Sequence, residues 1–199
     1  LPIFTAVLIQ EKFKEKKIDI TNYLKIVELN SQIKLGPFEI DFVTLTHSIL
    51  EPNGLSITTP EGVILHTGDW KVDPNPLIGN KVDETKLKSI GKKGVIAMIC
   101  DSTNVFTPGR AGSEKDVRES LLKIISTQKK RVLVTSFASN VARMESIFYI
   151  AKQTKRNISL VGRSMNRIYK AAKQCGYLKD VINPVDPRDA NKISKDRIR

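Results

Sequence analysis

The residues of this chain that are best suited to metal chemistry stand just after apolar runs of sequence. His47 follows one such run, and His66 and Asp69 follow a second. These are the only two histidines among the 199 residues, and Asp101 directly follows a third apolar run. Imidazole nitrogens and carboxylate oxygens are ligands that zinc and similar divalent ions take in proteins. One interpretation of this spacing is a metal site at which three strands end.

A second interpretation of the histidines stays open at this point. A lone histidine at the end of a strand more often completes a hydrogen bond in the core than it binds a metal. Two histidines and two carboxylates at strand ends favour the metal interpretation somewhat. The spacing alone does not decide between the two.

Strands and turns must position these residues in the first half of the chain. The strand candidates are short apolar runs bounded by turn-forming residues. After an opening helix at 6–16, they lie at residues 23–29, 32–35, 38–46, 55–58, 62–65 and 94–100. The last run is continuously apolar, which predicts a strand buried on both faces.

A helical period replaces this pattern in the second half. Three helices are predicted, which begin after Ser113, Asn140 and Gly162, the first with a capping box. Strands at 131–135 and 157–161 separate them. This alternation predicts a parallel sheet with crossover helices, whose loops gather at the carboxyl ends of the strands.

Two loops at that predicted edge carry hydroxyl and amide groups just before helices begin. Free backbone N–H groups and the helix dipole favour an anion there, and an arginine fork can hold two phosphate oxygens. The candidate residues for RNA or phosphate binding are Ser136, Ser139, Asn140, Arg143, Arg163 and Ser164. The alternative is that Asn140 and Ser164 serve only as helix caps.

The net charge of +12 lies entirely in the second half of the chain. Residues 1–112 hold 13 Lys and Arg and 13 Asp and Glu, whereas residues 113–199 hold 20 and 8. A basic field of this kind attracts polyanions, and Lys and Arg contacts to phosphate are the usual source of nucleic-acid affinity that does not depend on sequence. A solvated basic surface without a partner remains the alternative.

The composition fits a soluble protein, which we expect to be cytoplasmic. No apolar run approaches the ~20 residues that a membrane-spanning helix needs, and no leader pattern is present. Cys100 and Cys175 show no metal-type pairing, so we expect core thiols. Because the chain begins at Leu1 without Met and ends without a tail-like composition, we expect it to be part of a longer protein.

Five segments together resemble the motifs of the ribonuclease J family, in that family's order and over nearly the whole chain. They are Thr-His-Ser-Ile at 46–49, Leu-His-Thr-Gly-Asp-Trp-Lys at 65–71, Cys-Asp-Ser-Thr-Asn at 100–104 followed by Pro108-Gly109, Thr-Ser-Phe-Ala-Ser-Asn-Val-Ala-Arg at 135–143, and Gly-Arg-Ser-Met at 162–165. The resemblance is specific because no single motif carries it.

The resemblance implies a fold of the metallo-β-lactamase superfamily, β-CASP group. The expected fold class is α/β. Residues 1–112 would form part of a metallo-β-lactamase αββα domain, and residues 113–199 the first portion of a basic, RNA-facing β-CASP domain with a parallel sheet. In this family the RNA runs between the two domains.

The same resemblance implies roles for the strand-end residues. His47 would be a terminal metal ligand, and Asp69 would bridge two metal ions, usually zinc. Asp101 would orient groups of the metal site, and His66 would support its loop. The implied activity is 5′–3′ exonuclease and endonuclease cleavage of single-stranded RNA by a hydroxide that the two ions activate. The parent protein would be a homo-oligomer.

The sequence also departs from the family pattern. Leu50 and Glu51 follow the first motif, where the family commonly has Pro and an acidic residue. The family's upstream His-x-His-x-Asp-His cluster and its later histidines do not occur in this sequence. With only His47 and Asp69 as ligands, a stable two-metal site cannot form. We therefore expect this chain alone to be catalytically inactive, and its exposed sheet edges to favour self-association.

Other functions stay open beside this one. A DNA-processing nuclease of the β-CASP group is the nearest alternative, because RNA and DNA differ by 2′-hydroxyl contacts that no residue here identifies. A non-catalytic RNA-binding remnant is another. The charge of the second half speaks against a hydrolase of small molecules.

Overall fold

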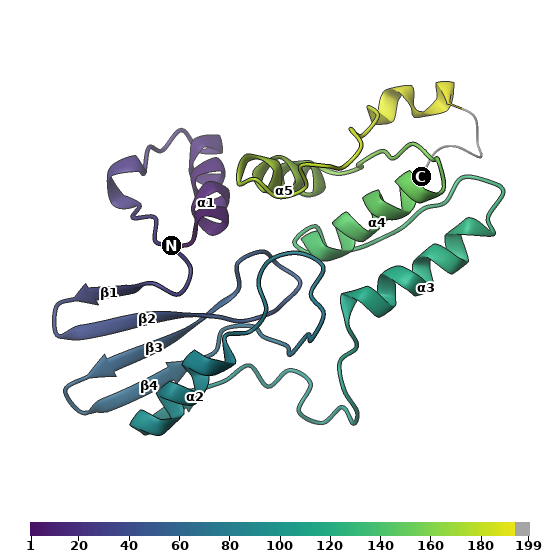
Figure 1. The fold of residues 1–199 in the computed structure, drawn as a ribbon. Coiled ribbons are helices and arrows are strands. Elements are labelled where there is room, and N and C mark those ends of the chain that lie inside the picture. Colours follow the sequence, from purple (N-terminus) through teal and green to yellow (C-terminus); the bar gives the residue numbers. More distant parts are fainter. Residues whose placement is uncertain (194–199) are drawn as a thin grey trace. The chain divides into compact units, whose positions relative to one another are not determined.

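The computed structural model describes residues 1–193, which divide into two units with a mixed α/β fold (Figure 1). Unit 1 comprises Leu1–His47 and Glu51–Ala111, and unit 2 comprises Ser48–Leu50 and the chain from Gly112 onward. In the part of the chain that the structure describes, no helix is long and apolar enough to cross a membrane.

Unit 1 is built on a five-stranded sheet with two α-helices. Its elements are α1 (Ile3–Glu15), the 3-10 helix η1 (Thr21–Tyr23), β1 (Gln32–Leu35), β2 (Phe38–Thr44), β3 (Asn53–Thr59), β4 (Gly62–His66), α2 (Glu84–Lys93) and β5 (Val95–Ile99). The strand order is β1-β2-β3-β4-β5. Neighbours are antiparallel except β4 and β5, which are parallel. Strands β2, β4 and β5 therefore run in one direction, and their carboxyl ends lie at one edge of the sheet.

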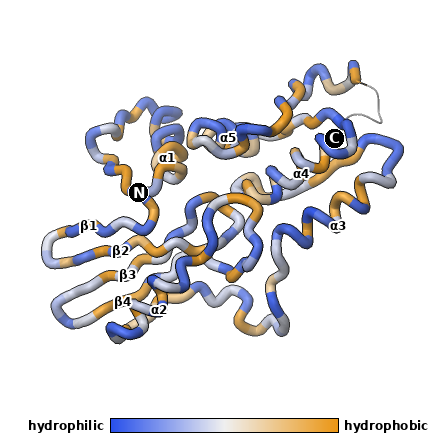
Figure 2. Tube along the Cα trace, in the orientation of Figure 1, coloured by the Kyte–Doolittle hydropathy of each residue, from blue (hydrophilic) through white to orange (hydrophobic). Residues whose placement is uncertain are grey.

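Tight turns and a small apolar core hold this sheet in register. The β3–β4 hairpin turns at Gly62, whose φ of +146° and whose closeness to Ile96 leave no room for a Cβ atom. On one face of the sheet, α2 buries Ile90 against Val43 and Val63. The alternation of apolar and polar residues along β2 and β3 can be followed in Figure 2.

The N-terminus of α1 has a polar partner from a distant part of unit 1. The backbone N–H of Phe4 donates to the buried carboxylate of Glu51 at 2.8 Å. A carboxylate suits this position because the first N–H groups of a helix lack partners within the helix and the dipole favours negative charge there. Glu51 is the acidic residue that follows the first family-like motif.

Two predictions for unit 1 were wrong in detail, and one helix was missed. Residues 24–29 form no strand, and only η1 lies at the start of the predicted segment. The helix α2 was not predicted, although Asp83 caps it by accepting a hydrogen bond from the Lys86 N–H at 2.9 Å. Strand β5 is not buried on both faces, because it ends the sheet and only Val95 packs against the core that contains α2; Ile96 and Met98 are each 62% exposed, and Ile99 is 56% exposed.

Unit 2 contains the three predicted helices, α3 (Glu114–Ser126), α4 (Val141–Gln153) and α5 (Arg163–Gln174), followed by the 3-10 helix η2 (Pro187–Lys192). The capping box of α3 is formed. The Ser113 hydroxyl accepts from the N–H of Lys115 at 3.2 Å, and the Asp116 carboxylate accepts from the N–H of Ser113 at 3.2 Å. Helices α4 and α5 bury a shared apolar face, in which the rings of Phe148 and Tyr169 stack with centroids 5.5 Å apart.

The two strands predicted for unit 2 differ from what the structure contains. Residues 131–135 and 158–161 belong to no strand of a sheet in the described part of unit 2. Leu133 is 89% exposed and Val161 is 75% exposed. An apolar run indicates that a segment favours burial. A strand also needs a neighbouring strand to which it is hydrogen-bonded, and the run itself does not specify that neighbour.

Candidate functional site

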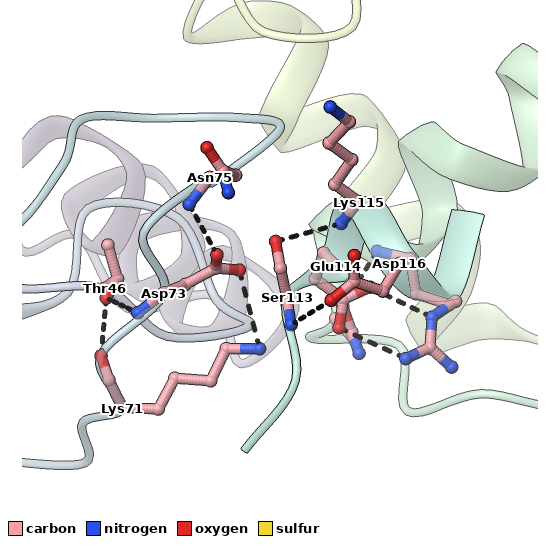
Figure 3. A network of polar contacts seen from close by, with 10 residues as sticks. Thr46, Lys71, Asp73, Asn75, Ser113, Glu114, Lys115 and Asp116 are labelled. Carbon is pink, nitrogen blue, oxygen red and sulfur yellow. Dashed lines mark hydrogen bonds and ion pairs between the residues drawn. The ribbon is translucent and has the colours of Figure 1, made fainter. Parts of the chain in front are cut away.

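The candidate site lies in unit 1, where the segments after β2, β4 and β5 come together. The N–H of Lys71 donates to the carbonyl of Thr46 at 2.9 Å, and the Thr46 hydroxyl donates to the carbonyl of Lys71 (Figure 3). The same hydroxyl accepts from the N–H of Asp73 at 3.1 Å. These bonds fix the segment that carries His47 beside the segment that carries Asp69.

Similar contacts join the third segment to the second. The N–H of Thr67 donates to the carbonyl of Ile99 at 2.9 Å, and the Thr67 hydroxyl accepts from the N–H of Asp101 at 3.1 Å. The indole of Trp70 donates to the carbonyl of Asp101 at 3.3 Å. The structure thus brings together the three strand ends that carry the predicted metal-site residues.

The carboxylate of Asp101 is held in its ionised form. Its Oδ1 accepts from the hydroxyl of Thr103 at 2.5 Å and from the N–H of Thr103 at 3.0 Å. These hydrogen bonds lower the pKa of Asp101 below its ordinary value, and the nearby His47 lowers it further. A charged carboxylate near an imidazole suits a residue that orients a ligand.

His66 bonds within its own loop. Its Nδ1 accepts from the N–H of Gly68 at 3.0 Å, which closes the turn directly after β4. Gly68 has a φ of +60°, a backbone conformation that favours glycine. This geometry agrees with the loop-supporting role expected for His66, and the role stays a prediction.

His47 and Asp69 differ in burial and in their polar surroundings. His47 is half-buried, and its buried Nδ1 has no hydrogen-bond partner among the residues that the structure describes. A buried nitrogen left without a partner costs about 1–3 kcal/mol, so a ligand at this position would offset a real penalty. Asp69 is exposed to solvent.

The donors in this chain do not by themselves fit a two-metal centre. Within residues 1–193, three or more His, Cys, Asp or Glu side chains come together nowhere in a way that could hold a metal ion. A zinc ion takes about four ligands, and two ions take more than His47 and Asp69 can offer. The expectation that this chain alone forms an incomplete metal site stays a prediction.

The predicted phosphate-binding residues of unit 2 divide into two groups. Asn140 caps α4 by accepting from the N–H of Arg143 at 2.8 Å. Arg143 itself donates from Nε and Nη2 to both oxygens of the Glu114 carboxylate, each at 3.1 Å, so its fork is already occupied (Figure 3 shows the contacts of Glu114). These two residues have structural partners, as the alternative for Asn140 anticipated.

The remaining candidates lie on the surface of unit 2. Ser139, Arg163 and Ser164 are exposed, and Ser136 is half-buried, its hydroxyl lying 3.3 Å from the carbonyl of Phe137. Ser164 lies inside the first turn of α5 and does not cap it; Gly162 occupies the cap position. Their binding role remains a prediction.

Sequence reasoning missed the threonines that build the site. Thr46 and Thr67 tie the three segments together, and the hydrogen bonds from Thr103 stabilise the ionised form of Asp101. The signal was present, because each threonine stands within two residues of a predicted site residue. Hydroxyls at such positions commonly bond the backbone of a turn.

Comparison with known proteins identifies the family. The model of the ribonuclease J β-CASP domain matches residues 129–199. Ribonuclease J of Sinorhizobium meliloti is 37% identical over 197 residues, which are 98% of this chain and 35% of that protein. Ribonuclease J of Corynebacterium glutamicum is 42% identical over 178 residues, 88% of this chain and 24% of that protein.

A solved structure shares the fold. A protein of unknown function from Enterococcus faecalis V583 matches with a TM-score of 0.64 and 17% identity, over 98% of this chain and 51% of that one. The chain spans about a quarter to a third of the length of the curated relatives above. With its identity to these relatives and the match to the β-CASP domain, the chain belongs to the ribonuclease J family, as a part of such a protein.

Proposed function

We propose that the natural protein to which this chain corresponds is a metal-dependent ribonuclease that degrades single-stranded RNA from a 5′-monophosphorylated end and also cuts internally. The observation that carries this proposal is the identity of 34–42% to ribonucleases J over most of the chain. The convergence of the segments that carry His47, Asp69 and Asp101 supports it.

This chain alone is proposed to bind RNA without cleaving it. In the natural protein, His47 and Asp69 would be metal donors, most simply for zinc, and further donors would come from outside residues 1–199. Asp101, charged at neutral pH, would orient groups beside them, and His66 would hold the loop that carries Asp69. The basic residues of unit 2 would contact the RNA backbone.

The test uses the natural polypeptide that contains this segment and a 5′-monophosphorylated single-stranded RNA. We expect cleavage, and a loss of at least roughly a hundredfold on Asp69→Ala, since metal ligands carry the chemistry of such sites. Glu61→Ala, an exposed carboxylate on the β3–β4 turn, is the matched control and should leave the rate unchanged. Undiminished cleavage by the Asp69→Ala protein would overturn the proposal.

The charge of unit 2 favours a second candidate, RNA binding without catalysis. Residues 120–179 hold thirteen Lys and Arg and a single acidic residue, Glu145. A natural protein that binds RNA tightly but never cleaves it would establish this candidate. Cleavage of single-stranded DNA in place of RNA would instead establish the DNA-processing alternative.

A further inference from the structure

We propose that unit 2 binds the phosphate backbone of single-stranded RNA on a lysine patch at the carboxyl ends of α3 and α4, away from the loops that the sequence suggested. The lysine patch consists of Lys129, Lys130, Lys152 and Lys155. This inference deepens the proposed function, and rests on it in taking RNA as the ligand.

A buried arginine holds the two parts of the lysine patch together. Arg156 is 7% exposed; its Nη1 donates to the carbonyl of Lys130 at 2.8 Å, and its Nη2 donates to the carbonyl of Gln128. The loop after α3 is thereby fixed against the end of α4. Arg156 has no carboxylate partner in the described residues, so its charge adds to the positive potential of the surface.

The four lysines of the patch are exposed. None of the four forms an ion pair within the part of the chain that the structure describes. Clustered lysines at an exposed surface repel one another weakly in water, and a bound polyanion removes that repulsion. Lys152 also lies in the last turn of α4, where a cation stabilises the helix dipole, but Lys129 and Lys130 lie beyond the end of α3.

A polar cleft runs beside these charges. Its volume is about 540 Å³, and its lining is Ser126, Gln128, Lys129, Gln153, Thr154 and Arg156. Amide and hydroxyl groups next to ammonium groups suit a sugar-phosphate chain, which offers phosphate oxygens and hydroxyls. The chemistry of the cleft therefore matches that of the proposed ligand.

The backbone at Lys155 offers a way to remove its charge without disturbing the turn. Lys155 has a φ of +51° and follows the end of α4, where the N–H of Arg156 donates to the carbonyl of Ala151 at 2.8 Å. Glycine is the residue that suits this left-handed position. Lys155→Gly therefore removes the charge while keeping the turn, which makes it a clean probe.

The test measures the binding of a labelled single-stranded RNA to the 199-residue chain by fluorescence anisotropy, between 50 and 300 mM KCl with EDTA present. The patch variant is Lys129→Gln, Lys130→Gln, Lys152→Gln and Lys155→Gly. Each phosphate contact to a single strand contributes about 0.7 to the salt slope, so losing four should lower the slope by about 3 and the affinity at 0.1 M salt by roughly several hundredfold. Replacing the same four lysines with Arg should keep the wild-type binding.

The control variant removes four charges from exposed lysines of unit 1, at Lys25, Lys34, Lys92 and Lys93. It should bind RNA within a few fold of the wild type, and an equal loss in this variant would overturn the inference. A third variant, with Ser136→Ala, Ser139→Ala and Arg163→Gln, tests the loops. Loss of binding in the loop variant alone would overturn the inference while leaving the proposed function in place.

The natural polypeptide separates the two proposals. Cleavage by that protein together with unchanged RNA binding by the patch variant would leave the proposed function standing without the lysine patch. Single-stranded DNA of the same sequence should bind to the chain within a few fold of RNA, because the patch contacts phosphates. Loss of DNA binding alone in the patch variant would overturn the assignment to RNA.

Discussion

The ion pair between Arg143 and Glu114 predicts a structural role for this arginine, whereas the sequence predicts a phosphate-binding role. Arg143→Ala removes two hydrogen bonds of 3.1 Å and leaves a carboxylate whose side chain is 8% exposed without its guanidinium. Removing one partner of a buried pair costs about 3–5 kcal/mol. Arg143 is partly exposed, and Glu114 lies in the first turn of α3, where the helix dipole stabilises its negative charge. We therefore expect Arg143→Ala to lower the free energy of unfolding by about 2–3 kcal/mol, less than the full cost of breaking a buried pair.

The assay is urea unfolding of the 199-residue chain, monitored by far-ultraviolet circular dichroism. Glu114→Gln and the double variant complete a cycle, in which we expect a coupling of about 1–2 kcal/mol. Arg163→Ala, an exposed arginine in the first turn of α5, should change stability by less than about 0.5 kcal/mol. If Arg143→Ala changes stability no more than this control and weakens RNA binding instead, the reasoning is wrong and Arg143 binds phosphate.

Three further predictions concern unit 1. Thr103→Val removes a hydrogen-bond donor to Asp101, so the pKa of Asp101, measured by NMR titration, should rise toward its ordinary value. A lowered pKa in the folded state stabilises the protein above the unfolded-state pKa, and this stabilisation is lost as the pH falls. The variant should therefore lose part of its stability at neutral pH and little in acid. Gly62→Ala would set a Cβ atom 2.8 Å from Ile96 at a φ of +146°, and thermal unfolding should show a loss of about 1–3 kcal/mol; an unchanged midpoint would refute this. Asp83→Ala removes the cap of α2 and should cost about 1 kcal/mol in urea unfolding, whereas Asp83→Asn should cost little.

The elements that sequence could predict are those whose signals are local. The β3–β4 hairpin follows from two apolar runs and the turn at Gly62, and the capping box of α3 from Ser113 and Asp116. The exposure of Ile96 could not be predicted in this way. It depends on what covers each face of the sheet, and a continuous apolar run is the same whether one face or both are covered.

The candidate site shows the same division. The convergence of the segments at His47, Asp69 and Asp101 could be predicted, because strands of one direction end at one edge of a sheet. The partner of Arg143 could not, since Glu114 lies 29 residues away and on another helix. Local pattern predicts a phosphate site at this arginine, and it does not show the carboxylate partner that the tertiary structure adds.

The most direct test of the central claim is to incubate the purified 199-residue chain with zinc and a 5′-monophosphorylated single-stranded RNA, and to follow binding and cleavage together. The account predicts salt-sensitive binding and intact RNA, because His47 and Asp69 alone cannot complete a two-metal centre. Cleavage that is abolished by Asp69→Ala would contradict it.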